Sequence, residues 1–152
     1  MKCRNCPITN VRYMDTSGYS GTALAKKLGI KQDYKIKLVN PPDHYFDLFS
    51  DLPENVQQVS NTKSKKNLIH FFVSQISKLK AGIPVLKKEI ESNGCIWVSW
   101  PKKASKIPTD VTEKEVRQIG LENGLVDIKV CAVDDIWSGL KFVIPLSDRQ
   151  PI

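Results

Sequence analysis

The chain has 152 residues, of which 41% are hydrophobic and 26% are charged, a balance typical of one globular domain rather than of a disordered or fibrous protein. No apolar run approaches the roughly 20 residues of a membrane-spanning helix. The first ten residues, MKCRNCPITN, also lack the apolar stretch of a signal peptide. We therefore expect a cytoplasmic domain that makes no contact with a membrane.

The formal net charge of +7 is concentrated in the middle of the chain. Residues 63–106 contain ten basic and two acidic residues, a net charge of +8, whereas the remainder carries −1. A basic block of this kind attracts phosphates and predicts nonspecific nucleic-acid binding at low salt. Lysines on helix faces and in loops also occur as a solvated surface without a partner, so both interpretations stay open.

The four cysteines indicate free thiols rather than a disulfide framework, because the expected compartment is reducing. Cys95 and Cys131 lie in apolar, strand-like runs and are predicted core residues. Cys3 and Cys6 form a CxxC pair, which is half of a typical zinc site, but no second pair follows. We therefore predict no metal.

The first predicted elements are a short helix and a strand. The helix covers residues 20–28, with Leu24 and Leu28 on its inward face and a stop at Gly29. Residues 35–39, KIKLV, then form the strand. We assign residues 1–16 to an N-terminal extension that precedes these elements.

A proline pair follows this strand. Pro41 and Pro42 end it, and Asp43 caps a predicted helix over residues 43–50 with an aromatic face. Residues 56–59 are a weaker second strand.

The centre of the chain contains the strongest strand signal. The run NLIHFFV at residues 67–73 predicts a parallel strand covered on both faces, with His70 as a hydrogen-bonded core residue. Apolar residues then recur at helical spacing over residues 76–90, where Pro84 predicts a kink and the Asn-Gly pair at 93–94 predicts the stop.

Another strand, CIWVSW at residues 95–100, leads into a lysine-rich loop. Thr112 and Glu115 have the spacing of a capping box, which predicts a helix as far as Asn123.

Two strands, at residues 125–133 and 140–146, end the predicted domain as an antiparallel hairpin, because residues 134–139 make only a short connection. The order of elements predicts a single α/β domain over residues 17–147, followed by a tail at 148–152. Its fold is three-layered and Rossmann-like, with a mostly parallel sheet and helices on both faces. It resembles a truncated class I methyltransferase fold.

That resemblance implies where S-adenosylmethionine would bind. Class I methyltransferases place a glycine-rich turn after the first strand and an acidic residue after the second. Here the first turn reads VNPPDHYF, and Ser60 and Asn61 follow the second strand. We predict no cofactor, and these two departures disfavour S-adenosylmethionine.

Three longer segments carry a closer resemblance: SGYSGTALAKKLGI, WVSWPKKASKIPTD and GLVDIKVCAVDDIWSGLKFV. In this order, across residues 17–144, they resemble the bacterial domain-of-unknown-function 3052 (DUF3052) family. The resemblance implies a small cytosolic bacterial domain with no established activity. Because that family's members begin just before the first segment, we expect Met14 to be the native start.

The predicted ligand site lies where loops meet at the carboxyl ends of the parallel strands. Lysines there would neutralise an anion, hydroxyls would donate hydrogen bonds, and an indole would stack on a planar ring. The alternative is a solvated basic loop after a buried tryptophan. The candidate residues are Asn40, Pro41, Trp100, Lys102, Lys103, Ser105, Lys106 and Thr109.

No arrangement typical of a nucleophilic or metal-dependent enzyme is present in the sequence. The leading hypothesis is a non-catalytic domain that binds a nucleotide-like or other small anion. The alternatives are a degenerate S-adenosylmethionine-dependent methyltransferase and a protein-interaction domain. In the last case Tyr19 and Trp137 would form the partner surface, although both can also pack within the chain. The sequence does not indicate an oligomeric state.

Overall fold

The computed structural model describes residues 23–149. Several predictions fall outside this range: the N-terminal extension, the CxxC pair, the Met14 start, the Tyr19 surface, the first residues of the 20–28 helix and the end of the tail.

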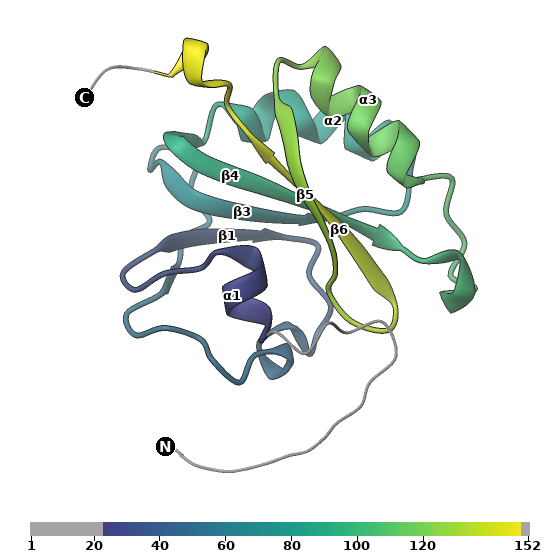
Figure 1. Cartoon of the computed structure of the whole chain (residues 1–152), viewed down its shortest axis with the longest axis horizontal. Helices are drawn as coiled ribbons and strands as arrows, with labels where there is room; N and C mark the ends of the chain where they lie inside the picture. The colour runs from purple at the N-terminus through teal and green to yellow at the C-terminus, as the bar shows by residue number, and fades with distance from the viewer. Residues whose placement is uncertain (1–22, 150–152) are drawn as a thin grey trace.

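The described residues form one sheet of six strands in the order β2-β1-β3-β4-β6-β5 (Figure 1). The first four strands in this order are parallel to one another, and β6 is antiparallel to both β4 and β5. The predicted mostly parallel sheet with a terminal hairpin is therefore confirmed. The strands are β1 (Lys35–Val39), β2 (Gln57–Gln58), β3 (Lys66–Phe72), β4 (Ile90–Pro101), β5 (Val126–Ala132) and β6 (Trp137–Val143).

Helices lie on both sides of this sheet and complete the three layers. Figure 1 shows α2 and α3 on one side, with α1 and a short 3₁₀ turn, η2, on the other. None of the helices in residues 23–149 combines the length and apolarity that a membrane crossing requires. The helices are α1 (Leu24–Leu28), η2 (Tyr45–Leu48), α2 (Ile76–Lys87), η3 (Lys103–Ser105), α3 (Glu113–Glu122) and η4 (Leu146–Asp148).

Each side of the sheet has its own hydrophobic core. The larger core lies under α2 and α3 and includes Ile83 and Phe142. The smaller one lies under α1, where the Trp97 indole N–H donates a hydrogen bond to the Leu28 carbonyl at 2.8 Å. That bond attaches the five-residue helix α1 to the centre of β4.

The capping box predicted for α3 is present. The Glu115 carboxylate accepts a hydrogen bond from the Thr112 backbone N–H at 3.0 Å. This bond satisfies one of the backbone donors that a helix start leaves free.

The final strand begins at Trp137 rather than at residue 140. The Asp134 carboxylate accepts hydrogen bonds from the backbone N–H groups of Ile136 and Trp137, both at 2.8 Å. This side-chain turn reverses the chain early, so Trp137 already pairs with Pro101 of β4. Trp137 therefore belongs to a strand. The prediction that it lies in the hairpin connection is wrong.

The boundary between α2 and β4 also differs from the prediction. Helix α2 continues through Pro84 but ends at Lys87, and β4 begins at Ile90, so the Asn-Gly pair at 93–94 lies inside a strand. The β3–β4 register shifts near this point. A Cβ on Gly94 would lie 2.9 Å from the Asn67 carbonyl oxygen, so glycine here permits a close approach of two strands.

The helix predicted over residues 43–50 is only the 3₁₀ turn η2. Tyr45 is buried and Leu48 and Phe49 pack against the smaller core, whereas Phe46 is 44% exposed. The chain is already extended at Phe49.

His70 is a hydrogen-bonded core residue, as predicted. Its Nδ1 lies 3.0 Å from the Tyr45 hydroxyl and its Nε2 lies 2.7 Å from the Ser99 hydroxyl. Complete burial lowers the pKa of His70 to about 3, so the imidazole is neutral at physiological pH.

Candidate ligand-binding site

The direction of the strand connections reverses at β1. The chain leaves β1 to form β2 on one side and then returns to form β3 on the other side of β1. No helix or strand interrupts the return from β2 to β3, as the sequence predicts. In open α/β sheets, ligands bind where the order reverses, outside the carboxyl ends of the two strands.

A groove of about 350 Å³ lies at this position. It is formed by the turn after β1, the end of β3, the first turn of α2 and the start of β6. Its volume is within the range of small-molecule sites, roughly 300–1,000 Å³. The lining residues are Asn40, Phe72, Val73, Ser74, Gln75, Lys78 and Trp137.

The polar side chains of the groove are suited to an anion. Lys78 carries the single formal charge among the lining residues, and it is positive. Asn40 and Gln75 are both exposed and each offers an amide group. Asn40 has a φ of 55°, a left-handed conformation that asparagine tolerates better than most residues.

An aromatic cluster forms the wall of the groove. The rings of Trp137 and Phe72 meet edge to face with their centroids 5.0 Å apart, and Phe72 stacks on His70 at 4.2 Å. The Tyr45 ring contacts His70 and Phe72 from η2. Trp137 is thus half-buried within the chain and held in place by these contacts, at a position open to a planar ligand.

The lysine-rich loop after β4 begins and ends beside the groove. The Lys102 backbone N–H donates to the Ile136 carbonyl at 2.8 Å, next to Trp137. At the other end, the Thr109 hydroxyl donates to the carbonyl of the groove residue Ser74 at 2.8 Å. The loop therefore borders the groove, with its lysines outside the set of lining residues.

The prediction that the Trp100 indole stacks on a ligand is wrong. It is 6% exposed and lies in the core beneath α2 and α3. Successive strand residues point to opposite faces, so Trp100 shares the helix-covered face with Val98 and Ile96. Its ring is not available to stack on a ligand, and the tryptophan that lines the groove is Trp137.

The predicted hydroxyl groups hold the loop together. The Ser105 hydroxyl donates to the Lys102 carbonyl at 2.6 Å and accepts from the Ile107 backbone N–H. The Thr109 hydroxyl also accepts from the Val111 backbone N–H at 3.0 Å. In this structure their hydrogen bonds are made within the protein rather than toward the groove.

Of the predicted ligand residues, only Asn40 lines the groove. Pro41 is exposed next to it, and Lys103 and Lys106 are exposed on the neighbouring loop, with Lys102 half-buried at its base. The prediction missed Lys78. The sequence nevertheless carried a signal for it. Lys78 lies in the first turn of a helix that follows a parallel strand, and such a turn lies at the carboxyl edge of the sheet.

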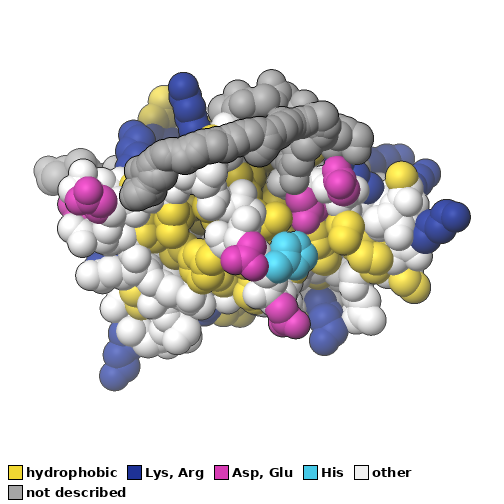
Figure 2. Space-filling view, turned by 90° about the horizontal axis from the view of Figure 1, so that it is seen from below, with side chains coloured by type: hydrophobic (Ala, Val, Ile, Leu, Met, Phe, Trp, Pro, Cys, Tyr) yellow, Lys and Arg dark blue, Asp and Glu magenta, His cyan; other side chains and the backbone are white. Residues whose placement is uncertain are grey.

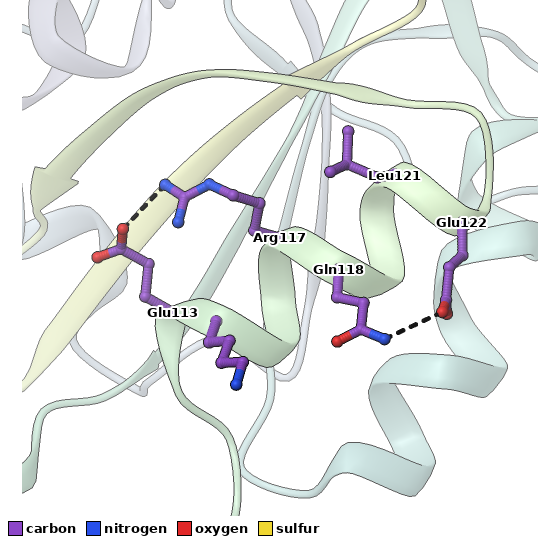
Figure 3. A pocket seen from close by; sticks show the side chains of 6 residues that line it. Glu113, Arg117, Gln118, Leu121 and Glu122 are labelled. Atoms are coloured by element: carbon purple, nitrogen blue, oxygen red, sulfur yellow. Dashed lines mark hydrogen bonds and ion pairs between the residues drawn. The ribbon is translucent and has the colours of Figure 1, made fainter.

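A larger hollow of about 600 Å³ lies on the outer surface of α3 (Figure 3). All of its lining residues belong to this one helix, and four of them form two side-chain pairs. Arg117 pairs with Glu113 at 2.8 Å, and Gln118 donates to Glu122 at 3.2 Å. Pairs of this spacing are typical of a solvated helix surface.

The end of the molecule that carries η2 has a different surface. Figure 2 shows hydrophobic side chains there beside a histidine and several acidic groups, with basic side chains mostly at the margins. His44 Nε2 lies 3.6 Å from the Asp134 carboxylate across this region. This end of the molecule is therefore not strongly basic.

Comparison with solved structures supports the methyltransferase-like Rossmann fold. The chain is similar to precorrin-6y C5,15-methyltransferase from Geobacter metallireducens, with 9% identity, a TM-score of 0.50, and coverage of 80% of this chain and 86% of that one. It is also similar to magnesium protoporphyrin IX methyltransferase from Synechocystis PCC 6803 with bound SAM, with 10% identity, a TM-score of 0.50, and coverage of 74% and 70%. Such identities establish the fold alone.

No family model matches the sequence, and no curated protein matches it. Membership of the DUF3052 family therefore stays a prediction.

Proposed function

We propose that this protein is a binding domain for a small, nucleotide-like anion, which it holds in the groove between the carboxyl ends of β1 and β3. One observation carries this proposal: Lys78 and Trp137 line the same groove at the point where the strand order reverses. A cation and an indole side by side suit a ligand with a negative group and a planar ring.

Each part of the groove has a role in this proposal. The Lys78 ammonium neutralises the anionic group of the ligand, while the Asn40 and Gln75 amides donate hydrogen bonds to it. The planar part of the ligand packs against Trp137. Lys103 and Lys106, on the bordering loop, raise the local concentration of anions and so increase the association rate.

The chemistry of the lining residues supports binding without catalysis. None of the residues that line the groove is a carboxylic acid, a histidine or a cysteine. The Cys95 thiol lies outside the groove, and burial raises its pKa to about 11, which disfavours the reactive thiolate. General acid–base and nucleophilic catalysis most often use such groups, and of the other side chains capable of this chemistry the groove offers only Lys78 and Ser74.

A second candidate function is a degenerate S-adenosylmethionine-dependent methyltransferase. The similarity of the fold and the position of the groove favour it. The residues fit the cofactor poorly, because Asn40 and two prolines replace a glycine-rich turn after β1. Ser60 and Asn61 follow β2, so the carboxylate that binds ribose hydroxyls is missing there.

Thermal unfolding in the presence of ligands tests the two functions. The probes are AMP, ATP, inorganic phosphate, S-adenosylmethionine and S-adenosylhomocysteine. A ligand at a hundred times its dissociation constant stabilises the folded state by about 2.7 kcal/mol, which raises the Tm of a domain of this size by roughly 5–10 °C.

We expect a nucleotide to raise the Tm and the Lys78→Gln variant to lose most of this rise. Lys80→Gln is the matched control, since Lys80 is an exposed lysine of the same helix outside the groove. A rise with only the two adenosyl compounds would favour the methyltransferase. No rise with any probe, or an equal loss in both variants, would contradict the proposed function.

A further inference from the structure

The helices α2 and α3 cover the same face of the sheet but differ in charge. Within α2 there are three lysines and no acidic residue. Within α3, Glu113, Glu115 and Glu122 outnumber Lys114 and Arg117, and the Arg117 guanidinium binds two carboxylates. The α2 surface is therefore positive, whereas the charges of α3 are largely compensated.

Two hydrogen bonds attach lysine-containing segments to the two ends of α2. The Lys65 ammonium donates to the Lys88 carbonyl at 2.8 Å, which places Lys65 at the end of α2. The Asp110 carboxylate accepts from the Ile76 backbone N–H at 2.8 Å, which places the end of the η3 loop at the start of α2. We group the exposed lysines of α2 and of the segments attached to its two ends as the basic band: Lys63, Lys65, Lys78, Lys80, Lys88, Lys103 and Lys106.

No carboxylate within residues 23–149 forms an ion pair with any lysine of the basic band. The nearby carboxylate of Glu89 is buried and already pairs with both Lys37 and Lys66 at 2.8 Å. The seven lysines of the band are all exposed, so their charge is available to a partner.

We propose that the basic band binds the phosphate backbone of a nucleic acid without reading its sequence. Helix α2 has 12 residues and a length of about 18 Å, which spans several consecutive phosphates of one strand. Contact with the bases of a single strand uses exposed aromatic side chains on which the bases stack, and none of the exposed large hydrophobic residues on α2 or the η3 loop is aromatic. The contact is therefore made to the backbone.

This inference is independent of the groove apart from three lysines: Lys78, which lines it, and Lys103 and Lys106 on the bordering loop. The test therefore leaves Lys78 unchanged. It uses the full chain and the double variant Lys80→Gln/Lys88→Gln, both exposed positions at which glutamine keeps the helix propensity. The control variant is Lys114→Gln, an exposed lysine on α3.

Fluorescence anisotropy with a labelled 20-base-pair DNA duplex and a labelled 20-nucleotide single strand measures binding between 50 and 200 mM salt. If about four phosphates are neutralised, the affinity falls roughly 100-fold over this range. The double variant should bind at least tenfold more weakly at 50 mM salt, with a salt slope smaller by about two. Lys114→Gln should bind as the unchanged protein does.

Three results would overturn the inference: no binding at 50 mM salt, a salt slope that the double variant leaves unchanged, or an equal loss in Lys114→Gln. Preferential binding to vesicles of anionic lipid would assign the band to a membrane surface instead. Circular dichroism verifies that each variant is folded. A nucleotide-induced rise in Tm that persists in the double variant would separate this surface from the groove.

Discussion

The two faces of the sheet are covered in different ways. On one face α2 and α3, with 12 and 10 residues, bury a core made of aliphatic and aromatic side chains. On the other face α1 has five residues and η2 has four, and the cover is attached by hydrogen bonds from Trp97 and His70. The first face depends mainly on packing, whereas the second combines a smaller hydrophobic core with a few buried polar anchors. The groove lies at the end of the sheet between these two covers.

The largest effect is expected on the helix-covered face. Ile83 of α2 is fully buried in the larger core, so Ile83→Ala removes apolar contacts and leaves a cavity. It should lower the free energy of unfolding by about 2–5 kcal/mol. Urea unfolding measures this, with Val85→Ala as the control because Val85, on the same helix, is 55% exposed. A loss below about 1 kcal/mol would show that packing on this face is loose.

On the opposite face we expect a smaller effect from one hydroxyl group. Tyr45→Phe keeps the ring contacts but removes the hydrogen-bond partner of His70 Nδ1. Leaving a buried polar atom unpaired costs about 1–3 kcal/mol. The control is Tyr34→Phe, because Tyr34 is half-buried and its hydroxyl makes no hydrogen bond within residues 23–149. Equal stability of the two variants would mean that the hydroxyl–imidazole pair contributes nothing.

The same face should make stability depend on pH. His70 has a pKa of about 3 when folded, against about 6.5 when unfolded, so only the unfolded chain gains this proton at mildly acidic pH. The contribution of His70 is constant above pH 6.5 and falls by about 1.4 kcal/mol per unit as the pH drops below it. Carboxylates with lowered pKa, such as Glu89, lose their stabilising effect only at lower pH.

Urea unfolding at several values between pH 5 and pH 7 measures this slope. The His70→Phe variant should be less stable throughout but nearly flat over the same interval, because the titrating group is gone. A slope that persists in the variant would assign the pH dependence to other groups.

The smallest expected change lies outside both faces, on the η3 loop. Lys106 has a φ of 62°, a left-handed conformation that disfavours residues with a Cβ. Lys106→Gly should raise the free energy of unfolding by about 1 kcal/mol. Lys103→Gly, at a position of the same loop without positive φ, should not raise it. Stabilisation by both would indicate that the loss of positive charge is responsible.

Local sequence signals predicted much of the chain correctly. The capping-box spacing of Thr112 and Glu115 marked the start of α3, and the apolar run around His70 marked the central strand. These features depend on neighbours within a few residues, so periodicity and turn chemistry report them. The weakest prediction was the 43–50 helix, because the apolar spacing of Tyr45, Leu48 and Phe49 also fits a single 3₁₀ turn that is extended at Phe49.

The candidate site was harder to predict. Asn40 was identified from its place after the first strand, but Trp100, expected to stack on a ligand, is buried, and Trp137, expected at a partner surface or packed within the chain, lines the groove. Strand periodicity indicates that adjacent residues alternate between faces, yet it does not reveal which face a helix covers. The position of Trp137 also depends on the turn made by Asp134, which moves the strand start into the predicted loop.

By itself the sequence determined the order of strands and helices, the mostly parallel sheet with its terminal hairpin, and the concentration of positive charge between residues 63 and 106. Only the tertiary structure decided that β6 inserts between β4 and β5, that Lys78 and Trp137 share a groove, and that lysine-containing segments adjoin the two ends of α2. The reason is physical: backbone preference and hydrophobic periodicity act over a few residues, whereas strand neighbours and convergent side chains depend on contacts between distant segments.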